Sequence, residues 1–199
     1  SMSLEHILRY VWGLGVPVIA LDDPGVFHGA CFREGGRNTI VVKQKTPSQA
    51  RWAFDVLHEL WHAAQEPNKP ERTVIEIDDV LSGVGTEEEQ VASQFAGAVL
   101  LGRNPQELAE RCLDQAGHDL SKLKTAVQRV GELEGVPVDS LANYMAFRLS
   151  SEGENWWGAA ANLQVVNGSP WRVVRDVLIE HMDFSKIADP EQDLIRQAL

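Results

Sequence analysis

Cysteine is scarce in this sequence of 199 residues, which contains only Cys31 and Cys112. Two cysteines so far apart along the chain argue against a disulfide framework and against a cage of thiolates around a metal ion. We expect both to be free thiols, buried or half-buried, in a reducing compartment.

Basic residues are also in the minority, because 18 Lys and Arg stand against 29 Asp and Glu and give a formal net charge of −11. Broad electrostatic binding to nucleic acids or to anionic membranes rewards a basic surface. The charge therefore argues against both kinds of partner, although it allows a locally basic patch.

Long hydrophobic runs are missing as well. No uncharged apolar stretch approaches the ~20 residues that a membrane-spanning helix needs. The N-terminal residues Ser1–His6 lack the basic-then-apolar pattern of a secretory signal peptide. We therefore expect a cytoplasmic protein that does not insert into membranes.

The residues that are present suit a folded protein, since 44% are hydrophobic and 24% are charged. This composition excludes wholesale disorder and fibrous classes. The length fits one domain, or one domain with a small appendage, because domains usually contain about 100–200 residues.

Three short strands are predicted near the N-terminus, after an initial helix at Leu4–Trp12. Their boundaries follow from β-branched runs and intervening turn residues, and they are Val16–Leu21, Val26–Arg33 and Thr39–Lys43. The turn between the first two is expected at Asp22–Gly25. Such a small sheet needs a helix against one face to be stable.

Helices dominate the rest of the chain. The first is predicted at about Pro47–Gln65 and the second at about Glu87–Leu101. Between them runs an acidic linker at Glu66–Thr86, with a short strand or turn at Thr73–Ile77. Six more helices are expected at Pro105–Ala116, Leu120–Leu133, Asp139–Leu149, Asn155–Leu163, Pro170–His181 and Pro190–Ala198.

We therefore predict an α+β fold, in which a small three-stranded sheet packs on the helix at Pro47–Gln65 and an all-helical C-terminal region follows. A core of residues 1–102 and a helical region of residues 103–199 are the predicted divisions. The acidic linker is either a solvated surface segment or a cover over a cleft, and the sequence does not separate these two interpretations.

The strongest chemical signal is the motif His58-Glu59-Leu60-Trp61-His62 within the helix at Pro47–Gln65. Side chains four residues apart on a helix differ by about 40° and rise about 6 Å, so both imidazoles project side by side and can bind one metal ion. Glu59 lies about 100° around the helix, where it suits a general base better than a ligand.

The two faces of this helix differ in character. The side opposite His58 carries an apolar stripe that is typical of packing on a sheet, made of Trp52, Ala53, Val56, Leu57, Leu60, Ala63 and Ala64. The side of His58 and His62 carries Arg51, Asp55, Gln65, Phe54 and Trp61. We therefore expect both histidines to point away from the main core.

A hydrolytic zinc site needs a third protein ligand and leaves a fourth position for water. No further histidine follows at short spacing, so a carboxylate is favoured. On the predicted helix Glu87–Leu101, Glu88 and Glu89 both fall on the apolar face, and Glu87 does not. A carboxylate aimed at an apolar interface is costly unless a cation meets it. The spacing does not choose between Glu88 and Glu89.

The sequence resembles the ImmA/IrrE family of bacterial zinc metallo-endopeptidases. The resemblance covers about residues 4–102, and its motifs are His58-Glu59-x-x-His62 and, on the next helix, Glu89-x-x-Ala92-Ser93-x-Phe95-Ala96. It implies a zincin-like fold for this part of the chain. It also implies that His58, His62 and Glu89 bind Zn²⁺ and that Glu59 is the general base.

Three departures from the family pattern bear on the site. Trp61 stands where the family usually has glycine, and it is expected to narrow the cleft or shield the metal. Ser93 replaces a usual asparagine. Asp55 lies one turn before His58, where it either fixes the tautomer of that imidazole or is a solvated surface residue.

The predicted function is zinc-dependent hydrolysis of a protein substrate, with the edge of the strand Thr39–Lys43 pairing with an extended segment of that substrate. Resemblance to the family implies that the substrate is a helix-turn-helix transcriptional repressor, cleaved in a stress, prophage or mobile-element response. The sequence contains no specificity pocket that identifies it.

A partner-binding regulatory protein with a structural or idle zinc site is one alternative. Its partner would bind the C-terminal helices, where Trp156, Trp157 and Trp171 are candidate anchors. Large aromatic residues are more often buried, so the core is the simpler place for them.

A DNA-binding regulator is the other alternative. The segment 121–149 has the spacing of a helix-turn-helix. Its second helix has only Arg148 as a basic residue, beside Asn143 and Tyr144. Phosphate contacts need a cationic face, so this function is disfavoured.

Overall fold

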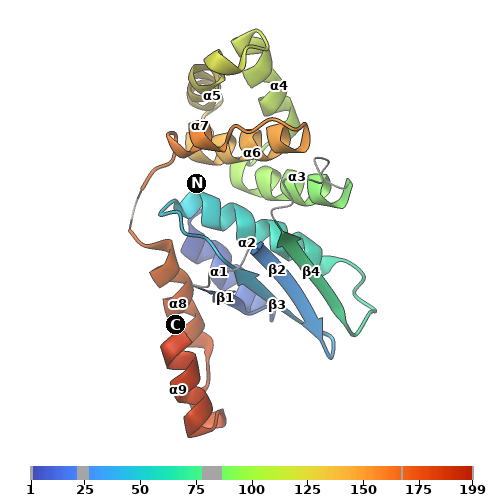
Figure 1. Cartoon of the computed structure of the whole chain (residues 1–199), viewed down its shortest axis with the longest axis vertical. Helices are drawn as coiled ribbons and strands as arrows, with labels where there is room; N and C mark the ends of the chain where they lie inside the picture. Colours follow the sequence, from blue (N-terminus) through green and yellow to red (C-terminus); the bar gives the residue numbers. More distant parts are fainter. Residues whose placement is uncertain (1, 22–26, 78–86, 167, 199) are drawn as a thin grey trace.

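A mixed β-sheet of four strands forms one layer of the molecule (Figure 1). The computed structural model describes residues 2–21, 27–77, 87–166 and 168–198. The strands are β1 (Val18–Ala20), β2 (Phe27–Glu34), β3 (Arg37–Val42) and β4 (Arg72–Ile77). Their order in the sheet is β1-β3-β2-β4, with β1 parallel to β3 and the other pairs antiparallel.

The prediction of three strands is wrong, because β4 pairs with the side of β2 that the predicted hairpin leaves open. Thr73, Val74 and Ile75 favour a strand because they are β-branched. So short a run is stable as a strand only when a neighbour completes its hydrogen bonds, and β2 does so here. The turn predicted at Asp22–Gly25 lies outside the described residues.

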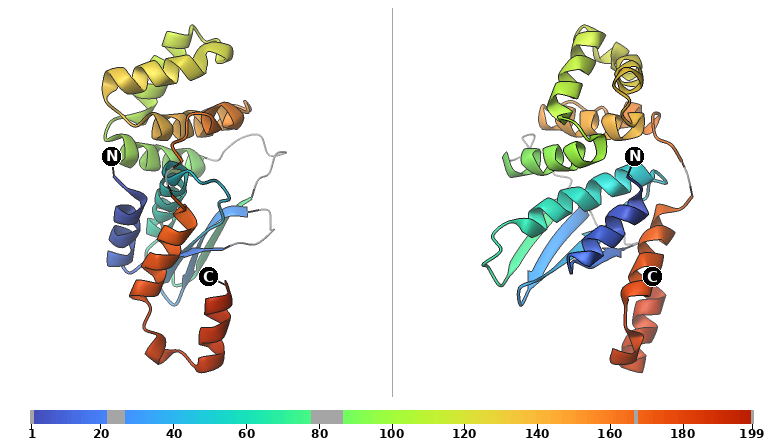
Figure 2. Two further views of the ribbon diagram at one scale, coloured as in Figure 1. Left: turned by 90° about the vertical axis from the view of Figure 1, so that its left-hand side faces the viewer. Right: turned by 180° about the vertical axis from the view of Figure 1, so that it is seen from behind.

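Two helices, α1 (Leu4–Gly13) and α2 (Gln49–Ala64), cover one face of the sheet, as the view from behind in Figure 2 shows. α2 begins after Ser48, whose hydroxyl accepts a hydrogen bond of 3.1 Å from the backbone N–H of Arg51. Most of the predicted apolar stripe is buried, since Trp52, Ala53, Val56, Leu57 and Ala63 are each at most 4% exposed. The prediction is wrong for Ala64, which is exposed, and Leu60 is half-buried.

A second layer of helices lies on the other side of α2 (Figure 1). Its members are α3 (Glu87–Leu101), α4 (Pro105–Ala116), α5 (Leu120–Glu134), α6 (Val138–Ser151) and α7 (Trp157–Ala161). α6 packs against both α2 and α3, and α4 and α5 pack against each other above it. The helices predicted here are confirmed, with boundaries that differ by a few residues.

The chain ends in α8 (Pro170–His181), a short 3₁₀ turn η1 (Phe184–Lys186) and α9 (Asp189–Ala198). α8 returns to the lower layer and packs against α1 and β1, whereas α9 folds back beside α8 (Figure 2). The 3₁₀ turn was not predicted. The division of the chain at residue 102 stays a prediction, and one cluster of buried apolar residues includes side chains from both sides of it.

The expectation that both histidines point away from the core is wrong. His58 and His62 are 1% and 0% exposed. Phe54, on the same side of α2, stacks on Phe147 of α6 with ring centroids 4.3 Å apart. A helical wheel separates polar from apolar faces, but it does not show that a second layer covers the polar one.

The second helix of the disfavoured helix-turn-helix alternative is buried. Asn143 and Tyr144 of α6 are 2% and 3% exposed. Arg148, the basic residue of this helix, pairs with Glu110 and Glu152. Because α6 packs between other helices, it presents no cationic face to a DNA groove.

The tryptophans of the C-terminal half mostly contribute to packing. Trp156 is buried, and Trp171 lies edge-on to Trp52 of α2 with ring centroids 6.4 Å apart. Trp157 is half-buried and meets Phe147 edge-on at 4.7 Å. These contacts explain the aromatic residues without a partner protein.

Two expectations from composition can be compared with the structure. Cys31 and Cys112 are both free and buried, as predicted. Within the ranges described above, no helix has the length and apolar character needed to cross a membrane.

Candidate metal centre

His58 and His62 bring their ring nitrogens together on one face of α2. The two Nε2 atoms are 3.1 Å apart, and both side chains are buried. This convergence is the geometry expected from their spacing of four residues. Two Nε2 atoms so close together can share one cation.

Glu89, from the first turn of α3, completes the cluster. Its Oε2 lies 3.0 Å from Nε2 of His58, and its Oε1 lies 3.3 Å from Nε2 of His62. Burial alone raises the pKa of Glu89, but hydrogen bonds and charge from the two histidines outweigh it and hold the pKa well below its usual range. Glu89 is therefore an anionic oxygen donor aimed at the two Nε2 atoms.

The three residues fit a bound metal ion. One donor atom from each of His58, His62 and Glu89 lies within 4.8 Å of the others. Two imidazole nitrogens and one carboxylate oxygen are a donor set that suits Zn²⁺. No fourth His, Cys, Asp or Glu joins this group among the residues that the structure describes.

Glu88 lies on the opposite side of the His62 ring. Its Oε1 is 3.3 Å from Nδ1 of His62, and the same oxygen accepts a hydrogen bond from Arg72 of β4. The helical spacing left Glu88 and Glu89 as equal candidates, and the family resemblance implied Glu89. The structure separates them, because only Glu89 approaches the Nε2 atoms.

Glu59 is buried between α2 and the sheet, with 1% of its surface exposed. A Cβ atom added to Gly29 in β2 would fall well inside contact distance of Glu59 Oε1. Gly29 was not identified from the sequence, although a glycine inside a strand often marks a close approach. It leaves room for the carboxylate.

Cys31, two residues further along β2, has a thiol whose pKa is affected by the same carboxylate. Burial raises the pKa of its thiol to about 11, and the negative charge of Glu59 contributes. The thiol therefore stays protonated and neutral beside Glu59 at physiological pH. Neither Gly29 nor Cys31 is close to α2 in sequence, which is why the motif alone did not reveal them.

Asp55 and Ser93 occupy the surroundings of His58. Asp55 is 3% exposed and pairs with Arg51 at 3.0 Å, so the interpretation as a solvated surface residue is wrong. Ser93 of α3 places its Oγ 3.3 Å from Nδ1 of His58. Phe147 stacks on the same imidazole at 6.1 Å. The serine that departs from the family pattern thus contacts His58 directly.

A buried arginine fixes the end of α2. Arg33 of β2 is 5% exposed and donates hydrogen bonds of 2.6–3.3 Å to the backbone carbonyls of Ala63, Gln65, Glu66 and Lys69. Asn38 of β3 donates to Ala63 as well. The last carbonyls of a helix lack intrahelical partners, and here side chains of the sheet satisfy them. The position of His62 is thereby tied to the sheet.

The comparison with known proteins agrees with this geometry. Residues 14–141 match the model of the peptidase M78 family, described as the IrrE N-terminal-like domain. The chain belongs to this family. The match includes β1 to α5 and ends inside α6, so it contains every residue of the histidine and glutamate cluster. No curated protein matches the chain.

In this peptidase M78 family member, Trp61 lies beside the metal cluster. Its ring meets that of His62 nearly at right angles, with centroids 5.3 Å apart. On its outer side Trp61 borders a shallow groove of about 650 Å³ together with α3 and the start of α4. Trp61 therefore contacts the buried His62 and also lines this groove.

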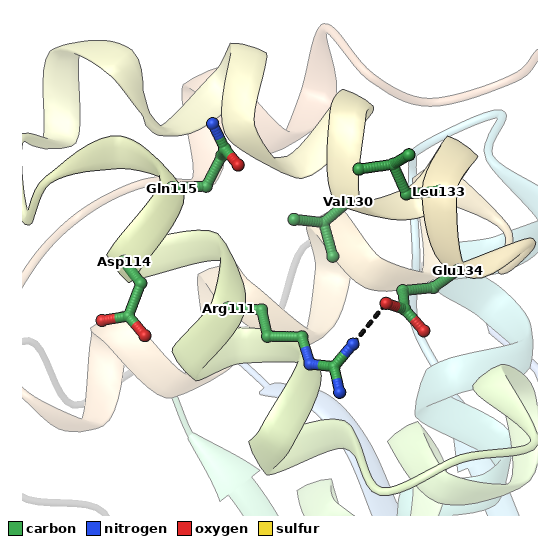
Figure 3. Close-up of a pocket in the computed structure, with 6 residues that line it drawn as sticks. All are labelled: Arg111, Asp114, Gln115, Val130, Leu133 and Glu134. Atoms are coloured by element: carbon green, nitrogen blue, oxygen red, sulfur yellow. Dashed lines mark hydrogen bonds and ion pairs between the residues drawn. The ribbon is translucent and has the colours of Figure 1, made fainter.

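A second hollow lies far from the cluster, between α4 and α5 (Figure 3). It has a volume of about 410 Å³ and is lined by Arg111, Asp114, Gln115, Val130, Leu133 and Glu134. Arg111 crosses it to pair with Glu134. None of its lining residues belongs to the histidine and glutamate cluster, so it is not part of the candidate metal centre.

The strand expected to receive a substrate is not at an edge. β3, which contains most of Thr39–Lys43, lies between β1 and β2 and pairs with both. The expectation that its edge is open is therefore wrong. Among the described strands, β4 occupies the edge next to β2.

Proposed function

We propose that the chain is a zinc-dependent endopeptidase. The observation that carries the proposal is the convergence of His58, His62 and Glu89, together with a buried glutamate, Glu59, that directly follows His58 in the same helix. Membership in the peptidase M78 family supports it. Three ligands from the protein suit a hydrolytic site, because such a site keeps one position for water.

In this proposal His58, His62 and Glu89 hold Zn²⁺. A zinc ion bound there supplies Lewis-acid chemistry, since it lowers the pKa of water and polarises a carbonyl group. The protein contributes the fixed positions of the ligands. Ser93 and Glu88 contact the Nδ1 atoms of the two imidazoles, and Arg33 holds the end of the helix.

Glu59 is proposed as the general base. Its carboxylate accepts a proton from the attacking water and later donates it to the leaving amine. Gly29 allows the carboxylate to lie against β2. The burial of Glu59 shields this proton transfer from bulk water.

An extended protein segment is the proposed substrate, and the edge of β4 is its proposed docking strand. β4 begins at Arg72, which donates a hydrogen bond to the backbone carbonyl of His62. The strand therefore starts beside the metal ligands. Backbone pairing along an exposed strand is a common way to bind extended peptides.

Cleavage of a helix-turn-helix repressor in a stress, prophage or mobile-element response is the proposed biological setting. It is supported only by resemblance to the ImmA/IrrE family. In the alternative of a structural zinc site, a fourth protein ligand closes the coordination. The three-residue cluster in the described part of the chain favours the hydrolytic alternative.

The test compares the zinc-loaded wild-type protein with Glu59→Gln and His58→Ala. Cleavage of a peptide library and of purified helix-turn-helix repressors is followed by mass spectrometry, and zinc content is measured by elemental analysis. We expect the Glu59→Gln variant to keep its zinc and lose cleavage, and the His58→Ala variant to lose both. Equal cleavage by wild type and Glu59→Gln would refute the role of Glu59, and a zinc-free wild type would refute the site.

A further inference from the structure

His62 contacts a different glutamate with each of its ring nitrogens. Nε2 faces Glu89 Oε1 at 3.3 Å, on the side where His58 also points. Nδ1 faces Glu88 Oε1 at 3.3 Å on the other side of the ring. Two neighbouring residues of α3 therefore flank one imidazole.

Arg72 holds Glu88 in this position. The guanidinium donates one hydrogen bond to Glu88 Oε1 and another to the backbone carbonyl of His62. The Arg72 side chain is only 14% exposed, whereas that of Glu88 is 45% exposed. A largely buried cation from β4 thus anchors a carboxylate that would otherwise move freely at the surface.

The Nδ1 atoms of the two histidines contact different groups. Nδ1 of His58 faces the neutral hydroxyl of Ser93, whereas Nδ1 of His62 faces a carboxylate that is itself paired with an arginine. A carboxylate is the stronger acceptor for an imidazole N–H. The contact between Glu88 and His62 is therefore expected to affect metal binding.

We propose that Glu88, held by Arg72, is a positioning residue that keeps the proton of His62 on Nδ1 and leaves the lone pair of Nε2 for the metal. The proposal rests on the metal site of the proposed function. It assigns different tasks to adjacent carboxylates, because Glu89 binds the metal and Glu88 orients a ligand. A hydrogen bond at one imidazole nitrogen determines which nitrogen carries the proton, and partners of this kind tune metal affinity.

The experiment compares Zn²⁺ affinity among variants by competition with a chelator. Glu88→Ala is expected to weaken binding by about 10- to 100-fold, the usual effect of removing such a partner. Glu88→Gln keeps an oxygen acceptor and is expected to lose less affinity. Glu87→Ala is the matched control, since Glu87 is exposed in the same turn and its removal changes the net charge equally.

A second measurement locates the proton of the His62 ring and follows its exchange with solvent. In ¹⁵N NMR of the zinc-loaded wild type, we expect His62 to show a slowly exchanging proton on Nδ1. In Glu88→Ala that proton is expected to exchange rapidly with solvent, and in Glu87→Ala to be unchanged. Thermal unfolding of each metal-free variant shows whether the half-exposed Glu88 can be replaced without loss of the fold.

Three results would overturn the inference. The first is equal losses of affinity in Glu88→Ala and Glu87→Ala, which would reduce the effect to net charge. The second is a proton on Nε2 of His62 in the zinc-loaded protein. The third is unchanged affinity and proton exchange in Glu88→Ala. If instead the wild type binds no zinc, the proposed function fails first and this inference with it.

Discussion

The end of α2 and the helix α8 each contact an arginine from another element, but in different surroundings. At the end of α2, the buried Arg33 donates to four backbone carbonyls. On α8, Glu180 pairs with Arg9 of α1 while both side chains are about half exposed, and His181 stacks on Trp12. α8 is held mainly by apolar residues such as Val174 and Val177, which are buried.

The difference shows where polar contacts determine structure. A buried guanidinium cannot exchange its partners for water, so each of its hydrogen bonds constrains the backbone that it meets. An exposed ion pair exchanges with water and salt at little cost. The contacts that hold the metal-binding end of α2 are of the first, buried kind. The ion pair on α8 is of the second, exposed kind.

Replacement of Arg33 should give the largest effect. We expect Arg33→Met to lower the free energy of unfolding by about 3 kcal/mol, because one buried and three partly buried carbonyls lose a charged donor. Zinc affinity should fall with it, since His62 precedes those carbonyls. Urea denaturation measures the first effect and chelator competition the second. Arg37→Met, on the exposed part of the same hairpin, is the control and should behave like wild type.

Gly29→Ala should come next. The added methyl group collides with Glu59, and overpacking of this kind costs about 1–3 kcal/mol. We expect zinc binding to persist and peptide cleavage to fall sharply, because the displaced group is the proposed base and not a ligand. Gly13→Ala in α1, where a Cβ atom meets nothing within 4 Å, is the matched control. Full activity in Gly29→Ala would argue against the position assigned to Glu59.

Two buried thiols, Cys31 of β2 and Cys112 of α4, allow the layer of the sheet to be compared with the second layer of helices. Burial raises the pKa of Cys31 to about 11, with help from Glu59, and burial raises that of Cys112 to about 12. When the thiol pKa is higher in the folded than in the unfolded protein, its contribution to the free energy of unfolding is fully present below the unfolded pKa of about 8.5. This contribution is lost as the pH rises through the folded pKa values of about 11 and about 12. At pH 8 we therefore expect slow alkylation of both thiols by iodoacetamide.

The same alkylation experiment can separate the effect of the Glu59 carboxylate on the pKa of Cys31 from the effect of burial. Glu59→Gln should speed the alkylation of Cys31 and leave that of Cys112 unchanged, as measured by mass spectrometry of tryptic peptides. Equal rates for Cys31 in wild type and variant would show that Glu59 does not contribute to its pKa.

The exposed pair of α8 should give the smallest effect. We expect Arg9→Gln and Glu180→Gln to leave the melting temperature within experimental error of wild type, because water and salt replace the lost partner. A clear decrease in either variant, measured by calorimetry at two salt concentrations, would mean that α8 depends on this ion pair and not on its apolar face.

Much of the fold was accessible from local patterns. The helices α3, α4 and α8 have the predicted boundaries, because caps, prolines and glycines mark them in the chain. The strand β4 was only an alternative to a turn, since its stability comes from pairing with β2. The burial of His58 was missed because α6, which covers it, lies more than seventy residues further along the chain.

The sequence by itself determined that His58 and His62 share one face of a helix with Glu59 between them, because helical geometry depends only on neighbours along the chain. Tertiary structure alone decided how Arg33 and Arg72 hold the end of α2 and that Gly29 faces Glu59. It also brought Glu89 to the Nε2 atoms, a choice that helical spacing had left open. These contacts join strands and helices that are distant in sequence. Their partners are selected by packing and by the cost of leaving buried polar groups without hydrogen bonds, which no local pattern encodes.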